Sequence, residues 1–199
     1  MNRSSFILGF IKQIRQKDVL ILRALLVIDV QNVLVEKVDF RQEKERIKKL
    51  INEFMQNEEP VIFIRHTDPE GPMADGSKGA EIDPDLVKYA DHTIEKHTES
   101  AFYKTNLDTL LCSYEVDQIF ITGFNTEFCC LFTAIAGYDR GYKVKFIENA
   151  VSTVHNEENY QMPGLNIREF VGTVLHWSHE IKVTDYEEYA EKNDANNHQ

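Results

Sequence analysis

Cysteine is scarce in this chain. The 199 residues include three cysteines, Cys112, Cys129 and Cys130. An odd and small number of cysteines does not build a disulfide framework and is typical of a reducing compartment, which predicts a cytoplasmic protein. Because no Cys-x-x-Cys pair occurs, the chain also lacks the spacing of a simple zinc knuckle.

Long apolar runs and basic clusters are missing as well. No run approaches the ~20 apolar residues that a membrane helix needs, so we expect no membrane partner. The formal net charge is -11, and no cluster rich in Lys and Arg offsets it. Since an acidic surface repels phosphate backbones, we also expect no nucleic-acid partner.

What the chain does contain is typical of one globular domain. Hydrophobic residues make up 42% of the chain and aromatic residues 11%, which at this length allows one domain with a substantial core. We place this domain at residues 24–188. It lies between an N-terminal helical extension, residues 1–23, and a tail, residues 189–199, that we expect to fray.

The N-terminal extension has an apolar pattern of its own. Five side chains recur there at helical spacing: Phe6, Ile7, Phe10, Ile11 and Ile14. Basic residues interrupt the segment and no small-residue cleavage site follows it, which argues against a signal peptide. We favour a helix that packs within the chain or across a dimer. Two alternatives are an arm on a partner subunit and a helix on a membrane surface.

Short apolar strands alternate with amphipathic helices along the rest of the chain. The expected strands cover residues 24–30, 60–65, 91–97, 118–124, 142–150 and 179–184, and the expected helices cover residues 41–57, 106–115, 126–141 and 167–177. Such alternation predicts parallel strands joined by right-handed crossovers. We therefore expect an α/β fold with three layers, α/β/α, around a mostly parallel, six-stranded, Rossmann-like sheet.

Four reactive side chains fall at the carboxyl ends of these strands, where such sheets bind ligands. Asp29 lies near the end of the first strand, His66 follows the second and Lys96 ends the third. Cys129 opens the helix after the strand at 118–124. Three of them have a plainer interpretation: the aspartate as a partner of backbone amides, the lysine as a surface residue and the cysteine as a small core residue. Their convergence instead predicts an acid, an amine and a thiol around one cavity.

Among the three cysteines, Cys129 has the position of a reactive thiol. Unpaired amides and the helix dipole in the first turn of a helix favour a thiolate, so we expect its pKa below the usual ~8.5. Cys130 lies about 100° further round the helix, and we expect it to be core packing. We expect the same of Cys112, in a helix behind the sheet.

Three motifs occupy the predicted strand ends: LLVIDVQN at 25–32, EKHTESAF at 95–102 with TNL at 105–107, and ITGFNTEFCCLFTA at 121–134. In this order and spacing they resemble the isochorismatase-like cysteine hydrolases, and the resemblance spans residues 24–184. It implies a six-stranded parallel sheet flanked by helices and a catalytic triad of Asp29, Lys96 and Cys129. The sequence departs from the family pattern at Glu127, where aspartate is usual, and at Cys130, where valine is usual.

The resemblance also implies a mechanism. Asp29 takes the thiol proton, Lys96 stabilises the thiolate, and Cys129 attacks a carbonyl carbon to form a thioester. Backbone N–H groups of Asn125 and Cys129 hold the oxyanion, beside a non-proline cis peptide bond between Phe124 and Asn125. The expected substrate is a small amide, ureide or carbamoyl compound, hydrolysed without a cofactor.

Family members that hydrolyse nicotinamide bind a metal through an Asp-x-His pair and a further histidine. Here the order is reversed, with His66 before Asp68, and the next histidine is His92. We therefore expect no metal site and rank nicotinamide below other amides. The candidate pocket residues are Gln31, His66, Phe102, Phe124 and Phe128, although aromatic side chains are more often core than substrate contacts.

Three alternatives stand beside amide hydrolysis. One is an enol-ether hydrolase of the isochorismatase type, which can work without the cysteine. Another is a binding protein without turnover, which the presence of both Asp29 and Lys96 disfavours. The third is a thiol-redox protein that uses Cys129 and Cys130, whose adjacent positions would strain a disulfide. The resemblance further implies a homodimer or a larger homo-oligomer.

Overall fold

A single six-stranded sheet organises the computed structural model, which describes residues 22–197. All five strand pairings are parallel, and the order across the sheet is β3-β2-β1-β4-β5-β6. The predicted α/β fold and the sheet that the resemblance implies are therefore confirmed. The strands are β1 (Arg23–Ile28), β2 (Val61–His66), β3 (His92–Lys96), β4 (Gln118–Gly123), β5 (Lys143–Val151) and β6 (Lys182–Thr184).

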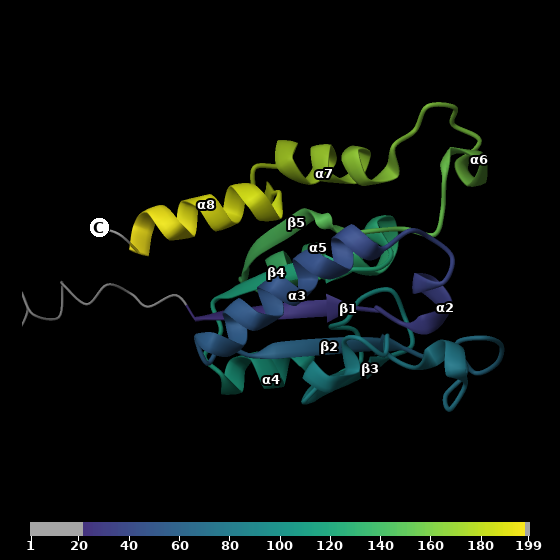
Figure 1. Ribbon diagram of the computed structural model, residues 1–199, viewed down its shortest axis with the longest axis horizontal. Coiled ribbons are helices and arrows are strands. Elements are labelled where there is room, and N and C mark those ends of the chain that lie inside the picture. Colours follow the sequence, from purple (N-terminus) through teal and green to yellow (C-terminus); the bar gives the residue numbers. More distant parts are fainter. Residues whose placement is uncertain (1–21, 198–199) are drawn as a thin grey trace, which may run out of the picture.

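Helices cover both faces of the sheet, as the three-layer prediction requires (Figure 1). One face carries α3 (Arg41–Gln56) and α8 (Tyr186–Asn197), whose apolar side chains pack with one core cluster. The other face carries α4 (Leu107–Ser113), α5 (Leu131–Asp139) and α7 (Ile167–Trp177), which pack with a second cluster. Two short helices, α2 (Asn32–Val35) and α6 (Glu157–Tyr160), and the 3-10 turns η1 (Lys78–Ala80) and η2 (Val87–Tyr89) complete the elements outside the site.

Burial on both faces explains why the central strands are almost continuously apolar. β1 reads RALLVI and is buried from its second residue onward. α3 presents Ile47, Leu50, Ile51 and Phe54 at helical spacing to the sheet, and all four are fully buried. Each such side chain contributes about 1.5–3 kcal/mol through removal of apolar surface from water.

Phe54 offers a direct measure of this packing. Its ring lies 5.0 Å from that of Phe120, edge to face, and the Arg23 guanidinium lies 4.8 Å above it. We expect Phe54→Ala to lower the free energy of unfolding by about 3–5 kcal/mol, because it removes a buried ring and leaves a cavity. Met55→Ala, next on the helix but 47% exposed, should change stability by less than about 0.5 kcal/mol in the same urea titration. Equal losses from the two variants would contradict this account.

The structure differs from the predictions at two helices. The helix expected at 126–141 begins with a π-helical segment, η3 (Thr126–Cys130), which then continues into α5. A helix that the sequence did not predict, α8, covers Tyr186–Asn197, and its Tyr189 is buried with its ring 5.2 Å from that of Phe120. The predicted helix over residues 1–23 lies almost wholly outside the described residues. Within residues 22–197, no helix combines the length and apolar character needed to cross a bilayer.

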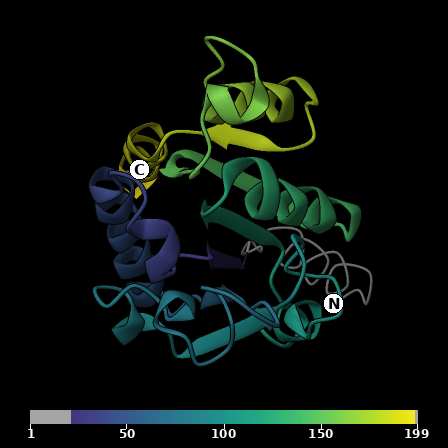
Figure 2. The same ribbon diagram turned by 90° about the vertical axis from the view of Figure 1, so that its right-hand side faces the viewer.

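The order of strands places the candidate site. The chain runs outward from β1 to β2 and β3 on one side and returns to β4 on the other, so the direction of winding reverses between β1 and β4. Gly123 ends β4 there with φ of 106°, and a Cβ at this position would lie 2.0 Å from the Ile28 carbonyl oxygen. Glycine is therefore required for the close approach of β4 to the end of β1. Figure 2 looks onto this carboxyl edge of the sheet.

Candidate active site

Asp29 lies directly after β1, on the carboxyl edge. Its φ is 50°, in the left-handed region, which aspartate tolerates better than most residues and which is more common at functional sites. The side chain is buried. One carboxylate oxygen, Oδ2, lies 2.7 Å from Lys96 Nζ, while Oδ1 is buried without a hydrogen-bond partner among residues 22–197. The carboxylate thus has one oxygen held by a cation and one open to accept a proton.

Lys96 ends β3 and is fully buried, which excludes the plainer interpretation of a surface lysine. Its ammonium lies 2.7 Å from Asp29 Oδ2, 3.0 Å from His66 Nδ1 and 3.2 Å from Cys129 Sγ. Burial alone lowers the pKa of this amine, but the Asp29 carboxylate, together with the hydrogen bond to Cys129, outweighs burial and raises the pKa above the usual value. Lys96 is therefore a cation at neutral pH, shared between the acid and the sulfur.

Cys129 approaches this cation from η3, and only 8% of the residue is exposed. Burial raises the pKa of its thiol, and the neighbouring Asp29 carboxylate raises it further, to about 12, against the opposing effect of Lys96. The expected low pKa at a helix start is therefore wrong. The first cause is desolvation, because the sulfur lies in the apolar cluster, and the second is the neighbouring Asp29 carboxylate, since both disfavour the thiolate. The resting group is a neutral thiol that needs a base.

The pKa of Cys129 gives a test in the free protein. Only the thiolate reacts with iodoacetamide, so the alkylation rate of Cys129 should rise about tenfold per pH unit from pH 7 to pH 10. A rate that levels off near pH 7 would mean a preformed thiolate and would contradict the assigned pKa. The measurement needs a Cys112→Ser background, because Cys112 is exposed and would otherwise react first.

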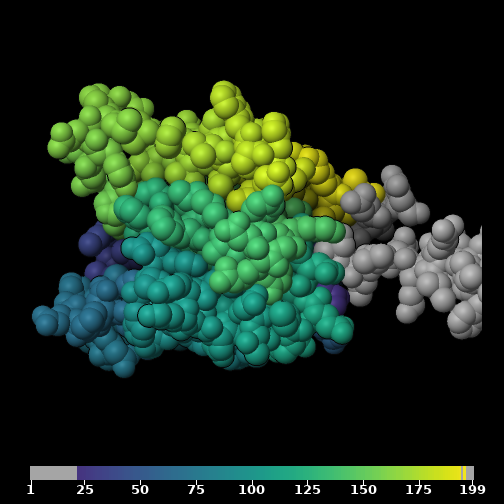
Figure 3. All heavy atoms as spheres, turned by 180° about the vertical axis from the view of Figure 1, so that it is seen from behind, coloured from purple at the N-terminus to yellow at the C-terminus, as the bar shows by residue number. Residues whose placement is uncertain are grey.

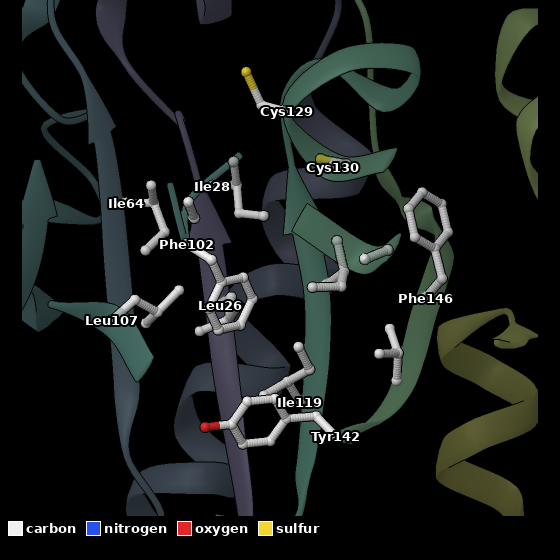
Figure 4. Packing of buried hydrophobic residues seen from close by; sticks show 14 of the residues in the cluster. Leu26, Ile28, Ile64, Phe102, Leu107, Ile119, Cys129, Cys130, Tyr142 and Phe146 are labelled. Atoms are coloured by element: carbon white, nitrogen blue, oxygen red, sulfur yellow. The ribbon is translucent and has the colours of Figure 1, made fainter. Parts of the chain in front are cut away.

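The other two cysteines have different surroundings. Cys130 is fully buried in the core, as predicted, and its pKa is raised well above the usual value by burial and by Cys129. Figure 4 shows the two adjacent sulfurs pointing in different directions, and both thiols are free. Cys112, expected to be packing, is instead exposed on α4, so that prediction is wrong. α4 buries Leu107 and Leu111, which places Cys112 away from the sheet.

His66 and Gln31 hold the triad and the end of β2 in place through hydrogen bonds. Because an ammonium can only donate, His66 Nδ1 accepts from Lys96, and Nε2 then carries the proton that it donates to Asp68 Oδ1 at 3.0 Å. The amide of Gln31 is fully buried: its Nε2 donates to the carbonyls of His66 and Ala80, and its Oε1 accepts from the His66 N–H. Gln31 therefore fixes the end of β2 and the following loop.

The side chains around Lys96 include three potential metal ligands. One ligand atom each from Asp29, His66 and Cys129 lies within 4.8 Å of the others. The Lys96 ammonium is already within hydrogen-bonding distance of all three side chains, so a metal ion would have to displace a buried cation. The residues present fit an ammonium better than a metal. His92, the next histidine of the sequence, lies at the start of β3, at the opposite end of that strand from Lys96.

The expected cis peptide bond is not found. Residues 22–197 contain no cis peptide, so the Phe124–Asn125 bond is trans and this prediction is wrong. The trans form is lower in energy for a non-proline bond, and the positive φ of Gly123 already turns the chain after β4. The Asn125 carbonyl accepts from the N–H groups of Phe128 and Cys130, whereas its own N–H donates to no group among the described residues. That N–H is free to bind an oxyanion.

The three candidate aromatic residues lie in different places. Phe124 is fully buried on the α3 face, with its ring 4.4 Å from that of Phe40. Phe102 is buried on the other face and stacks on Tyr142 with 5.9 Å between ring centroids. Phe128 is 37% exposed, close to Cys129 in sequence, with its ring edge-to-face against His155 at 5.6 Å. Of the three, Phe128 is the one that a substrate can reach from solvent.

Glu127 has a structural role that the sequence did not reveal. Its Oε1 accepts from Thr153 Oγ1 at 2.8 Å, from His155 Nδ1 at 2.8 Å and from the Tyr160 hydroxyl at 3.0 Å. All three donors belong to the loop and short helix after β5. This one carboxylate therefore ties that loop to η3, two residues before Cys129. The departure from aspartate at 127 was the only signal in the sequence, because the partners lie in a loop without periodicity.

Comparisons with known proteins agree with this architecture. The family model of the isochorismatase domain matches residues 23–178, a range that contains Asp29, Lys96 and Cys129. The uncharacterized isochorismatase family protein YwoC of Bacillus subtilis is 30% identical over 152 residues, which are 68% of this chain and 80% of that protein. Nicotinamidase 3 of Arabidopsis thaliana is 29% identical over 160 residues, which are 72% of this chain and 79% of that protein. The crystal structure of a candidate isochorismatase from Burkholderia xenovorans LB400 has a TM-score of 0.75 and 29% identity, and the match covers 84% of this chain and 85% of that one.

Proposed function

Because this chain belongs to the isochorismatase family of hydrolases, we propose that it is a cysteine hydrolase that cleaves the C–N bond of a small amide, ureide or carbamoyl compound. The observation that carries the proposal is the position of one buried ammonium. Lys96 Nζ lies 2.7 Å from a carboxylate and 3.2 Å from a thiol, at the edge of the sheet where such folds bind ligands.

The first step of the proposed reaction is activation of the sulfur. With its pKa raised to about 12, Cys129 is a poor nucleophile until a base removes its proton. Asp29 supplies the base: its Oδ1 has no hydrogen-bond partner among the described residues, and a carboxylate oxygen lies within 4.8 Å of the sulfur. Lys96 holds the other oxygen and stabilises the thiolate as it forms. The thiolate then attacks the carbonyl carbon of the substrate.

The later steps use the same groups in reverse. The backbone N–H of Asn125, with that of Cys129, donates to the oxygen that becomes negative in the tetrahedral intermediate. Asp29, now protonated, gives its proton to the leaving nitrogen, and the acyl group stays on Cys129 as a thioester. Asp29 then takes a proton from water, which attacks the thioester and releases the carboxylate product and the free thiol.

The similarity to a nicotinamidase supports an amide as substrate class, while the reversed His66 and Asp68 pair favours amides other than nicotinamide. The test is a screen for ammonia release over simple amides, ureides and carbamoyl compounds. A substrate that turns over should then be mixed with the protein and quenched with acid, and the peptide that contains Cys129 should gain the mass of the acyl group. Turnover confined to enol ethers, without an adduct on Cys129, would overturn the proposal.

A further inference from the structure

Two neighbouring helices expose large apolar side chains on their outer surfaces. α5 buries Ala134 and Gly137 against the sheet, and α7 buries Val171 and Leu175. Figure 3 shows the two helices on the surface seen from behind, α5 in green and α7 in yellow-green. Their outward side chains, here called the α5/α7 apolar face, are 40–75% exposed: Phe132, Ile135, Tyr138, Phe170, Val174 and Trp177.

The α5/α7 apolar face is one surface. Both helices pack on β5, and Glu180, in the turn after α7, lies near enough to the Tyr138 hydroxyl at the end of α5 to raise its pKa. Monomeric proteins rarely expose a contiguous apolar patch of this kind. The face therefore requires a partner.

The chain itself supplies a segment with the right origin and length. Residues 1–21 lie outside the described structure and join it at Leu22, whose carbonyl accepts from the N–H groups of Asp117 and Gln118. This is the amino edge of the sheet, at which α5 and α7 both end. As a helix, 21 residues would span about 30 Å, whereas α5 and α7 are about 14 Å and 16 Å long. The segment is thus long enough to run back along the whole face.

The chemistry of this segment matches the face. Its sequence has the apolar stripe of Phe6, Ile7, Phe10, Ile11 and Ile14. Four basic residues and one acidic residue give it a charge of +3, so that the rest of the chain, within a total of -11, carries -14.

The border of the face is acidic. Asp139 and Glu169 lie beside its apolar residues, and of the nearby arginines Arg168 is paired with Glu43. Arg140 is also engaged, since it donates to the Ala136 carbonyl and lies over the Phe102 ring. A basic segment is therefore attracted to this border, and its apolar stripe has an apolar surface to cover.

We propose that residues 1–21 fold back as an amphipathic helix onto the α5/α7 apolar face of the same chain. The stripe centred on Phe10 packs against Phe170 and Trp177, and the basic residues lie toward the acidic border. The segment acts as a built-in cover for a surface next to the helix that carries Cys129.

Trp177 reports on this contact, because it is the only tryptophan of the chain. In the full-length protein we expect its fluorescence to be shielded from acrylamide. The double variant Phe10→Asp/Ile11→Asp should raise the quenching constant at least about twofold and shift the emission to longer wavelength, because a side chain 75% exposed without its cover returns to water. The control Ser5→Asp/Gln16→Asp adds the same charge on the opposite side of the predicted helix and should change neither value.

Three results would overturn the proposal. Equal quenching in the wild type and the Phe10→Asp/Ile11→Asp variant would show that the segment does not cover the face. Shielding that is lost on dilution, with a parallel change in mass by sedimentation, would assign the cover to a second copy of the chain. If the full-length protein bound anionic vesicles while acrylamide still quenched Trp177 as in the variant, the stripe would be assigned to a membrane surface. Slower hydrogen exchange at residues 131–139 and 167–177 in the wild type than in the variant would support it.

Discussion

Replacing Cys129 with alanine is expected to reduce the turnover number by about 10⁴-fold or more, because the covalent route is lost when its nucleophile is removed. The fold should remain, since alanine fits the space of a cysteine and the loss of one buried sulfur costs about 1 kcal/mol. The measurement is ammonia release with an identified substrate, together with thermal unfolding of the same samples.

Cys130→Ala is the matched control for that result. It removes the same atoms one residue later, from a side chain that is fully buried in the core and points in a different direction from Cys129, toward the Thr122 carbonyl. We expect it to lower stability by a similar amount and to leave turnover within about threefold of the wild type. If both variants kept full activity, the hydrolase would not use a thiol, and the enol-ether mechanism would become the better account. If both lost activity together with their fold, thioester trapping in the wild type would still decide the question.

The convergence of the triad followed from the sequence because it depends on features that are local in the chain. Buried parallel strands are nearly continuous apolar runs, so β1, β2 and β4 can be recognised in the sequence from the runs ALLVI, VIFI and IFIT. Once the strands are known, their carboxyl ends must lie on one edge, and Asp29 and Lys96 lie at two of these ends. The sheet therefore brings them together whatever the loops do.

The features that the sequence did not predict correctly depend on contacts between distant parts of the chain. The pKa of Cys129 was expected to fall because the helix start is visible in the sequence, whereas the burial and the Asp29 carboxylate that raise it are supplied by other elements. The partners of Glu127 come from an irregular loop, whose path no periodicity indicates. The exposure of Cys112 depends on which side of α4 faces the sheet. Because adjacent helical residues point about 100° apart, Leu111 faces the sheet and Cys112 faces solvent.

The second large effect is expected from Lys96→Met, which removes the central charge and keeps much of the side-chain length. Lys96 and Asp29 are both buried, so the variant leaves a carboxylate without its cation in a place that water does not reach. We expect a loss of about 3–5 kcal/mol in the free energy of unfolding, the usual cost of breaking a buried ion pair from one side. Turnover should also fall by about 10²–10⁴-fold, because the thiolate and the oxyanion lose the nearest positive charge.

A double variant separates the two consequences of this loss. Asp29→Asn/Lys96→Met contains neither charge, so its stability should recover by roughly 1–3 kcal/mol relative to Lys96→Met alone, while its activity stays lost. Lys104→Met is the control for removal of a lysine, since Lys104 is exposed and lies over the Tyr103 ring, and it should leave both measurements nearly unchanged. Additive stability losses in the double variant would show that the two side chains do not interact. The pairing of acid and ammonium, on which the proposed proton transfer depends, would then be wrong.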